Sequence, residues 1–436
     1  MPDLRTEDPD VMKLRQLIPC LWGAAACAFA AESGDAPARL PLDELQLFAQ
    51  VFDQVRNAYV EEIDDRVLLQ KAVTGLLGQL DPHSAFLEAE PYTELKEHTT
   101  GEFGGIGVEL GLDRGYVSVI SPIDDTPAAR AGLQPGDLIL QLDDRSTQGM
   151  SLEEAISLMR GTKGSALKLT IGREGATEPL VLTITRDTIT IKSVRKEMLE
   201  PDFAYLRIAQ FQEQTGAQFT RAIAELRKQA PALKGVVIDL RNNPGGLLPA
   251  SIEVADALLD SGLIVYTEGR IASANTRVMA TPGDALAGIP LAVLINEGTA
   301  SAAEIVAGAL KDHRRALIVG TKSFGKGSVQ TVLPLRDGRA IKLTTARYFT
   351  PSGNSIQADG IQPDVEVRRA EVRELEPGFV IKESNLEGHL ESGTKQPSSK
   401  HDADSGKPVD NQLHEAVNLL KALALFSRPT DPLAAQ

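Results

Sequence analysis

Cysteine is almost absent from this chain of 436 residues. The two that it has, Cys20 and Cys27, both lie in an N-terminal segment with the pattern of a cleaved leader. A mature chain without that segment would hold no disulfide, no thiol nucleophile and no cysteine-based metal site. Cysteine chemistry is thereby excluded as the basis of its activity.

Positive charge, histidine and long apolar runs are also scarce. The formal net charge of −15 argues against nucleic acid as a partner, because binding it needs a basic face. No pair among the six histidines has the spacing of metal ligands, so we expect no metal and no cofactor. Beyond the N-terminal segment, no stretch approaches about 18 uninterrupted apolar residues, the length that suggests a membrane-spanning helix.

The N-terminal segment, residues 1–30, has the features of an export signal. Residues 1–11 are acidic, but from Met12 the pattern is regular: Lys13 and Arg15 precede an apolar run over residues 17–28. We expect Met12 to be the true start, cleavage between Ala30 and Ala31, and a periplasmic mature chain. Two alternatives stay open, an uncleaved membrane anchor and a lipoprotein modified at Cys27.

Two amphipathic stretches in residues 41–100 predict an N-terminal helical region. In the first, apolar residues recur at helical spacing from Leu45 to Tyr59, and Asp43 stands where an N-cap is expected. The second stretch, residues 69–80, is broken by the turn at residues 81–84. Either the two helices pack against each other within one chain, or they form a dimer interface.

Residues 101–188 change to short β-branched runs separated by Gly and Pro turns, which predicts a small β-rich domain. A short helix and a turn over residues 126–137 lead into a strand. Ser151 then caps a second helix that ends at Arg160, with Glu154 completing a capping box.

A glycine-rich turn precedes these elements. Gly104, Gly105, Ile106 and Gly107 can form a nest of backbone N–H groups that holds a terminal carboxylate. An edge strand beside that nest can pair with an extended peptide. The arrangement resembles a PDZ domain, in the bacterial form whose strands are circularly permuted.

Strands and helices alternate over residues 189–370, which predicts an α/β layer with a partly parallel sheet. The strands at residues 236–238 and 291–295 are nearly all apolar, as in a sheet covered on both faces. The tail, residues 371–436, contains a polar stretch at 392–411 that we expect to be disordered. The helical stripe after it must dock on the chain's own body or on a second protomer, and we favour self-association.

One serine stands at a strand-to-helix corner of the alternating region. Ser301 follows the apolar strand at 291–295 and a short turn that contains a glycine, and it opens a helix. The N–H of Ala302 then lies at a helix N-terminus, where positive partial charge accumulates. A serine at a helix start is usually only a cap, so a base must lie nearby before Ser301 is assigned as a nucleophile.

Lys326 can supply that base. It lies 25 residues beyond Ser301, which leaves room for a helix, a strand and a return, and its neighbours Gly325 and Gly327 let the backbone fold closely. The amine serves as a base only if burial lowers its pKa from about 10.4 by roughly three pH units. Gln330 follows at an even offset, which on a strand puts both side chains on one face, so its amide oxygen can hold the amine.

A second loop can complete an oxyanion hole. Residues 239–246 leave a buried strand, and the paired glycines Gly245 and Gly246 can turn an N–H toward the end of a neighbouring strand. With the N–H of Ala302, this gives two donors for a developing negative charge. The alternative is that the glycines form an ordinary tight turn.

Together these motifs resemble those of the C-terminal processing peptidases, or tail-specific proteases, a serine-lysine family with a PDZ domain. The resemblance covers residues 41–370 and is carried by residues 80–84, 104–107, 239–246, 299–304 and 325–330. It implies an α/β (α+β) multidomain fold. A crotonase/Clp-protease-like core would follow an inserted, circularly permuted PDZ domain, with helical regions at both ends.

The resemblance also implies roles. Ser301 would be the nucleophile, Lys326 the general base, Gln330 its orienting partner, and Gly245 or Gly246 with Ala302 the oxyanion donors. The PDZ domain would receive the substrate's C-terminus and gate the cleft, with Arg160 as the contact to the active site. Related enzymes trim or degrade envelope proteins, including peptidoglycan hydrolases, and some need a helical-repeat lipoprotein. We therefore expect protein substrates, such an adaptor as a candidate partner, and a homo-oligomer.

Three other classes are less favoured. A histidine-based serine protease is one, but we expect His313 to be solvated at a charged helix end and His83 to bond locally after a turn proline. A non-catalytic peptide-binding scaffold is disfavoured because Ser301, Lys326 and Gln330 occur together. Acyl-CoA chemistry, which a crotonase-like core also supports, does not suit an exported chain with a PDZ domain.

Overall fold

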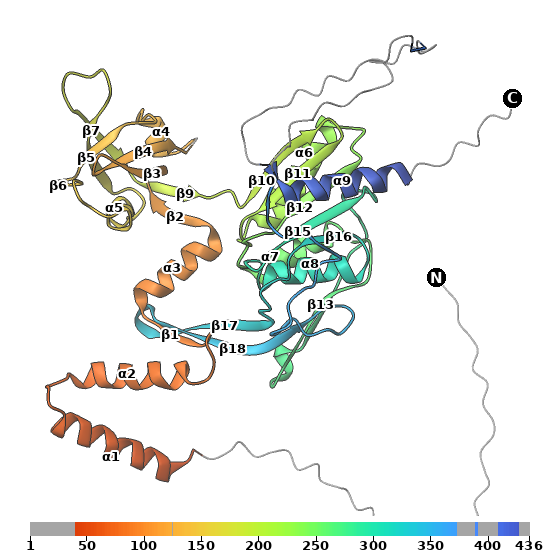
Figure 1. Ribbon diagram of the computed structural model, residues 1–436. Coiled ribbons are helices and arrows are strands. Elements are labelled where there is room, and N and C mark those ends of the chain that lie inside the picture. Colours follow the sequence, from red (N-terminus) through yellow and green to blue (C-terminus); the bar gives the residue numbers. More distant parts are fainter. Residues whose placement is uncertain (1–39, 124, 373–388, 391–408, 427–436) are drawn as a thin grey trace, which may run out of the picture. The chain divides into compact units, whose positions relative to one another are not determined.

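The computed structural model describes residues 40–123, 125–372, 389–390 and 409–426 (Figure 1). The leader predicted over residues 1–30 and most of the polar stretch predicted at 392–411 lie outside the described residues. The chain divides into two units, residues 1–70 and residues 71–436. Among the helices that the structure describes, none has the length and apolar content needed to cross a membrane.

The first unit contains α1 (Leu42–Ala58) and the start of α2 (Asp65–Gly78), which confirms the two predicted helices. No residue of α1 is buried, and the side chains of Leu45 and Phe48 are about half exposed. The cap predicted at Asp43 is wrong, because α1 begins after Pro41. Asp43 instead lies in the first turn, where its charge favours the positive end of the helix.

In the second unit, α3 (Ala89–Thr100) leads into the predicted β-rich domain. This domain has a six-stranded antiparallel sheet around a core that includes Val117, Ile139 and Leu167. Ser151 accepts a hydrogen bond from the Glu154 N–H, so it caps the second helix as predicted. The strands are β3 (Val108–Asp113), β4 (Tyr116–Pro122), β5 (Leu138–Leu142), β6 (Arg145–Ser146), β7 (Ala166–Gly172) and β8 (Leu180–Thr185), with α4 (Pro127–Arg130) and α5 (Leu152–Met159). A separate ribbon of β2 (Glu102–Gly105) and β9 (Asp187–Thr190) joins the two ends of the domain.

The predicted α/β layer is a second six-stranded sheet, in the order β10-β11-β12-β15-β16-β19. Only β10 is antiparallel to its neighbour, which confirms the partly parallel sheet. Alternate residues of β12 and β15 pack on opposite faces, one against α6, α7 and α8 and the other against α9, so both strands are apolar throughout. The bounds are β10 (Val194–Glu200), β11 (Phe203–Ile208), β12 (Gly235–Asp239), β15 (Leu291–Ile295), β16 (Leu317–Gly320), β19 (Val365–Glu366), α6 (Thr215–Gln229), α7 (Leu248–Asp256) and α8 (Ala302–Asp312).

The C-terminal helix α9 (Asn411–Phe426) forms where the apolar stripe predicts it. Of the two docking places that the sequence leaves open, the structure uses the chain's own sheet. Ala416, Val417 and Leu420 are buried against β12 and β15. The two-residue strands β20 (Glu371–Val372) and β21 (Val409–Asp410) pair just before this helix. Self-association through α9 stays a prediction.

Besides the α/β layer, the second unit contains a five-stranded sheet that the sequence did not predict. In it β17 (Ser328–Pro334) pairs with one edge of β18 (Ala340–Phe349), while β1 (Ala85–Leu87) and β13 (Leu263–Gly269) share the other edge. The remaining pieces are β14 (Thr276–Met279) and two short 3-10 turns, Ala272–Ala274 and Arg336–Gly338. Because β1 comes from the chain ahead of the β-rich domain, residues separated by more than 250 positions meet on β18.

Candidate active site

Ser301 stands at the corner between the buried strand β15 and helix α8, as predicted. Its backbone has φ 55° and ψ −117°, a conformation that residues other than glycine rarely adopt. Such strain persists only where surrounding contacts enforce it, and it is common at functional sites. The residue is almost buried, with 7% of its surface exposed.

A buried glutamate enforces this corner. The Ser301 N–H donates to Glu304 Oε2 at 2.7 Å, and the Glu304 side chain is fully buried. The same carboxylate accepts hydrogen bonds from Ser323 Oγ at 2.6 Å, Gly325 N at 2.7 Å and Lys326 N at 2.8 Å. Four donors from two distant segments therefore converge on one side chain.

Glu304 brings the predicted nucleophile and base together. The backbone nitrogens of Ser301 and Lys326 both bond Oε2, so they lie within 5.5 Å of each other, the sum of the two distances. Gly325 is needed here because its φ is +91°, and Gly327 because a Cβ there would lie 2.3 Å from the Gln357 nitrogen. The two glycines that flank Lys326 thus let the chain pass close to the turn at residues 357–360.

Lys326, the predicted general base, is half-buried. Burial lowers the pKa of its amine below the ordinary lysine value, and the positive charge of Lys342 lowers it further, while Glu304 acts in the opposite direction. A lowered pKa increases the fraction of neutral amine that can accept a proton near neutral pH. Among the described residues, no hydrogen bond joins this amine to the Ser301 hydroxyl, and in unliganded enzymes such contacts are often long.

His83 lies within the electrostatic reach of the same amine. Its backbone N–H donates to Asp81 Oδ1 at 2.8 Å. The local hydrogen bond expected of the histidine side chain stays a prediction. Burial lowers the pKa of its imidazole, with the charge of Lys326 next in effect. His313 corrects the prediction: its ring Nε2 lies 2.7 Å from the Leu263 carbonyl oxygen, in space that Gly262 leaves open, so the ring is half-buried and packed rather than free in solvent.

Gln330 is on β17, but the spacing argument for it was wrong. Lys326 lies in the loop before β17, so no strand alternation relates it to Gln330. A register shift between Val329 and Gln330 further redirects the side chain. The Gln330 amide nitrogen donates to Ser328 Oγ at 2.8 Å and to Thr344 Oγ1 at 3.4 Å.

The predicted oxyanion loop lies against Ser301. A Cβ on Gly245 would lie 2.8 Å from Ser301 Cβ and 3.0 Å from the Ala302 nitrogen, so only glycine fits. The Gly245 N–H is taken by Asn243 Oδ1 at 2.9 Å. The Gly245 carbonyl accepts a hydrogen bond from the Phe211 N–H. In a trans peptide the C=O and the following N–H point in opposite directions, so the Gly246 N–H points away from Phe211.

Backbone and side-chain hydrogen bonds join this loop to the corner at Ser301. The Asn243 carbonyl accepts the Ala300 N–H at 2.9 Å, and Thr299 Oγ1 donates to the Leu240 carbonyl at 2.8 Å. Asn242 and Asn296 exchange two hydrogen bonds of 2.8 Å across the same strand ends. The loop and the corner therefore form one hydrogen-bonded unit.

A tyrosine also lies beside Ser301. Burial raises the pKa of Tyr348 on β18 to about 12, and a side-chain hydrogen bond with Ser301 acts in the opposite direction. The phenol is therefore protonated near neutral pH. Its backbone N–H donates to the Gly327 carbonyl at 2.7 Å, which places Tyr348 next to the lysine loop as well.

In the β-rich domain, two carbonyl groups of the predicted nest at residues 104–107 accept hydrogen bonds from the segment at residues 123–128. The Ile106 carbonyl accepts from Ala128 N at 2.8 Å, and the Gly107 carbonyl accepts from Ile123 N at 3.0 Å. The next N–H groups in the chain therefore point to the opposite side. Gly104 and Gly105 instead pair with β9 in the ribbon. The edge strand expected beside the nest is β3, which has a neighbour only on its β4 side in the described sheet.

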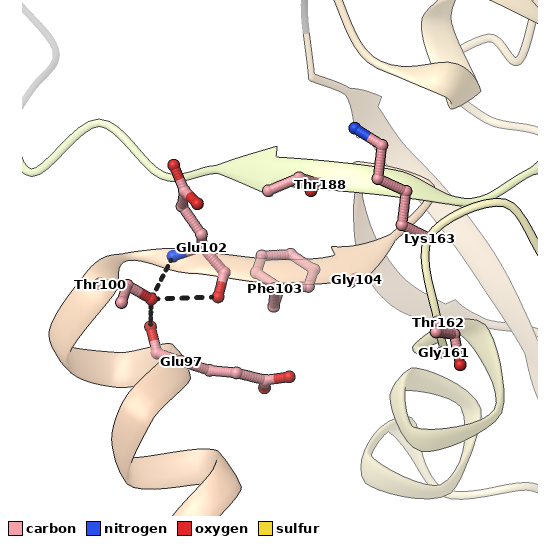
Figure 2. A pocket seen from close by; sticks show the side chains of 9 residues that line it. All are labelled: Glu97, Thr100, Glu102, Phe103, Gly104, Gly161, Thr162, Lys163 and Thr188. Atoms are coloured by element: carbon pink, nitrogen blue, oxygen red, sulfur yellow. Dashed lines mark hydrogen bonds between the residues drawn. The ribbon is translucent and has the colours of Figure 1, made fainter.

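Two cavities lie beside this domain, where Arg160 follows the end of α5. The larger, of about 390 Å³, is bounded by Glu97, Phe103, Gly104 and Lys163, as Figure 2 shows. Arg160 lines the smaller, of about 180 Å³. It forms an ion pair of 3.0 Å with Glu97 and lies over the Phe103 ring, while its Nε is buried without a partner among the described residues.

Comparison with known proteins identifies the chain's family. Residues 202–367 match "Peptidase family S41", and residues 118–173 match "PDZ domain". The chain is 45% identical over 399 residues to the carboxy-terminal-processing protease of Bartonella bacilliformis, covering 89% of this chain and 91% of that protein. It is 35% identical over 328 residues to carboxy-terminal processing protease CtpA of Bacillus subtilis, covering 75% and 69%. A solved photosystem II D1 C-terminal processing protease aligns with a TM-score of 0.45 at 34% identity, covering 74% and 93%.

The chain belongs to the carboxy-terminal processing proteases of peptidase family S41. The resemblance drawn from the motifs is thereby confirmed. The protein is a serine peptidase with a PDZ domain in a mixed α/β fold, and a PDZ domain is suited to peptides or protein C-termini.

Sequence reasoning missed several residues of this processing protease. Glu304 follows Ser301 by three positions, the spacing of a capping box, and that signal could have identified it. Thr344, Lys342 and Tyr348 are on β18, and nothing in the local pattern links them to Ser301. Only the pairing of β17 with β18 brings them to the lysine loop.

Proposed function

We propose that Ser301 and Lys326 are the catalytic dyad of this protease. Ser301 Oγ bonds to the scissile carbonyl carbon as the Lys326 amine takes the hydroxyl proton, and Lys326 gives that proton to the amine that leaves when the C–N bond breaks. Lys326 then takes a proton from water, whose oxygen bonds to the acyl carbon. Ser301 leaves with the proton that Lys326 returns. The observation that carries the proposal is the single Glu304 oxygen that holds both backbones.

The oxyanion would be stabilised by the N–H groups of Gly246 and Ala302. Gly245 was the other candidate, but its N–H is engaged by Asn243. Ala302 is the first residue of α8, where N–H groups have no partner within the helix. The close approach of Gly245 to Ser301 supports a donor from this loop.

We also propose that the PDZ domain presents substrates by their C-termini. The carboxylate would bind the N–H groups beside Gly107, and the peptide would extend β3. The order of its strands fits the circularly permuted form, because the ribbon of β2 and β9 ties the ends together. The parallel order of the second sheet fits a crotonase/Clp-protease-like core.

The proposed setting is the periplasm, with envelope proteins such as peptidoglycan hydrolases as substrates. Lys13, Arg15 and the apolar run before Ala30 support export, and N-terminal sequencing of the exported chain would test it, since a mature chain that retains Val11 would refute cleavage. A helical-repeat lipoprotein adaptor and a homo-oligomer belong to the same proposal. The exposed apolar side chains of α1 favour a protein partner.

Hydrolysis of an unstructured peptide that ends in small apolar residues tests C-terminal recognition. The same peptide with an amidated C-terminus should be cleaved roughly 10- to 100-fold less efficiently in kcat/KM, because a charged hydrogen bond contributes about 1.5–3 kcal/mol. Ser301→Ala should cleave neither peptide. Equal rates for the two peptides would contradict recognition of the carboxylate, while leaving the dyad intact.

Arg160 is proposed to report peptide binding to the active site. In the structure it is paired with Glu97, and its Nε has no partner among the described residues, so the guanidinium still has a donor for a new contact. Arg160→Ala should lower turnover by roughly 2- to 30-fold, the range of coupling mutations. Ser301 should still react with a small acylating probe. Arg130→Ala, which removes another PDZ arginine paired with a carboxylate, is the control, and unchanged turnover in Arg160→Ala would refute the role.

A further inference from the structure

The turn Asp81-Pro82-His83-Ser84 has no part in the proposed mechanism, yet it is hydrogen-bonded to β18, the strand that pairs with β17. The strand that follows it, β1, pairs with β18 from Ala85 opposite Lys342. Ser84 Oγ accepts the Thr344 N–H at 3.1 Å, and Thr344 Oγ1 donates to Asp81 Oδ1 at 3.1 Å. Thr344 is therefore held through both its backbone and its side chain.

Asp81 is a fixed acceptor. Its carboxylate also accepts the N–H of His83 at 2.8 Å, the N–H of Ser84 at 2.9 Å and the Ser84 hydroxyl at 2.7 Å. Burial raises the pKa of this carboxyl, but the bonds from Ser84, His83 and Thr344 outweigh it and leave the pKa below its usual value. An ionised carboxylate has no proton to donate, so Thr344 must donate to it.

That constraint sets the direction of the next bond. A hydroxyl has one proton and two lone pairs, and the Thr344 hydroxyl donates its one hydrogen bond to Asp81. Toward Gln330 it can only accept, so the NH2 end of the Gln330 amide faces Thr344 and Ser328. The amide oxygen is then the end directed away from these two hydroxyls.

We propose that Asp81, acting through Thr344, fixes the orientation of the Gln330 amide so that its oxygen is offered to the Lys326 amine. Asp81 and Thr344 are then positioning residues of the base. The inference rests on the proposed role of Gln330. It gives the turn at residues 81–84 a function in the reaction, although the turn contributes no reacting atom.

Thr344→Val tests this series of hydrogen bonds, because it removes the hydroxyl group and keeps the shape of the side chain. Losing the orientation of Gln330 should lower kcat about tenfold, within the contribution of general base catalysis, and leave KM within about twofold. Thr344→Ser should restore kcat to within about threefold of the natural protein. Asp81→Asn, whose amide can donate where the carboxylate only accepts, should lose kcat as Thr344→Val does. Thermal unfolding shows which variants fold, and Thr344→Ala replaces any valine variant that does not.

The decisive measurement is a double-mutant cycle. In a Gln330→Ala background, Thr344→Val should lower kcat by less than about twofold, since the residue it orients is gone. Thr345→Val is the matched control: this neighbour on β18 bonds Thr331 Oγ1 at 2.7 Å, and its removal should leave kcat within about twofold. If Thr344→Val costs as much without Gln330 as with it, the positioning role is wrong and the dyad stands. If Gln330→Ala alone costs nothing, the proposed role of Gln330 fails first.

Discussion

Replacement of Lys326 by alanine is expected to lower kcat for peptide hydrolysis by about 10⁴-fold, with KM little changed. The amine is the group proposed to take the Ser301 proton, and general base catalysis contributes up to about 10⁴-fold. Burial already lowers its pKa, so kcat/KM of the natural protein should rise with pH as the amine loses its proton, and level off below the usual lysine range. Steady-state kinetics between about pH 6 and 10 measures both effects.

Lys322→Ala is the control for this change. Lys322 lies four residues earlier in the same segment and its side chain is exposed, so its removal should leave kcat within about twofold. If Lys326→Ala kept a substantial share of the activity and its kcat/KM still rose with pH as in the natural protein, another group would take the proton. The assignment of Lys326 as the base would then be wrong.

Replacement of Glu304 by glutamine is expected to lower kcat by about 10² to 10³-fold in a protein that still folds. The amide keeps one oxygen for two of the four donors and presents an NH2 group to the other two. Unsatisfied buried donors cost about 1–3 kcal/mol each, so the Ser301 corner and the lysine loop should separate. Small shifts of reacting groups can cost about 10²-fold in rate. Glu304→Ala, which satisfies none of the four donors, should be destabilised by several kcal/mol.

Thermal unfolding and kcat of Glu304→Gln together separate positioning from folding. The matched control is Glu297→Gln, an exposed carboxylate near the same corner that bonds Thr321 Oγ1 at 3.0 Å. It should change kcat by less than about twofold. A Glu304→Gln protein with full activity would show that the shared carboxylate does not hold the dyad together.

Much of the fold was accessible from the sequence, because it depends on local patterns. Apolar residues at helical spacing predicted α1 and α9, and unbroken apolar runs predicted β12 and β15. The glycines around Lys326 and the serine after β15 indicated where the backbone turns sharply. The cap at Asp43 failed because the ends of helices depend on few residues, and a boundary shift of two positions changes the cap.

The way the site is held together could not be predicted in this way. The even offset between Lys326 and Gln330 assumed one continuous strand, whereas the structure has a loop and a register shift there. The pairing of β1 and β17 with β18 joins residues 81–84 to residues 328–344 across the whole PDZ domain, and no local period encodes such a contact.

The sequence by itself determined the helices and strands that follow local patterns, the serine at its corner, the flexible glycines and the chemical types present. The tertiary structure alone decided that Glu304 bonds both Ser301 and Lys326, and that Asp81 reaches Gln330 through Thr344. The reason is physical. Secondary structure follows from sterics and burial within a few residues, whereas each buried donor takes the acceptor that packing of distant segments brings within about 3 Å.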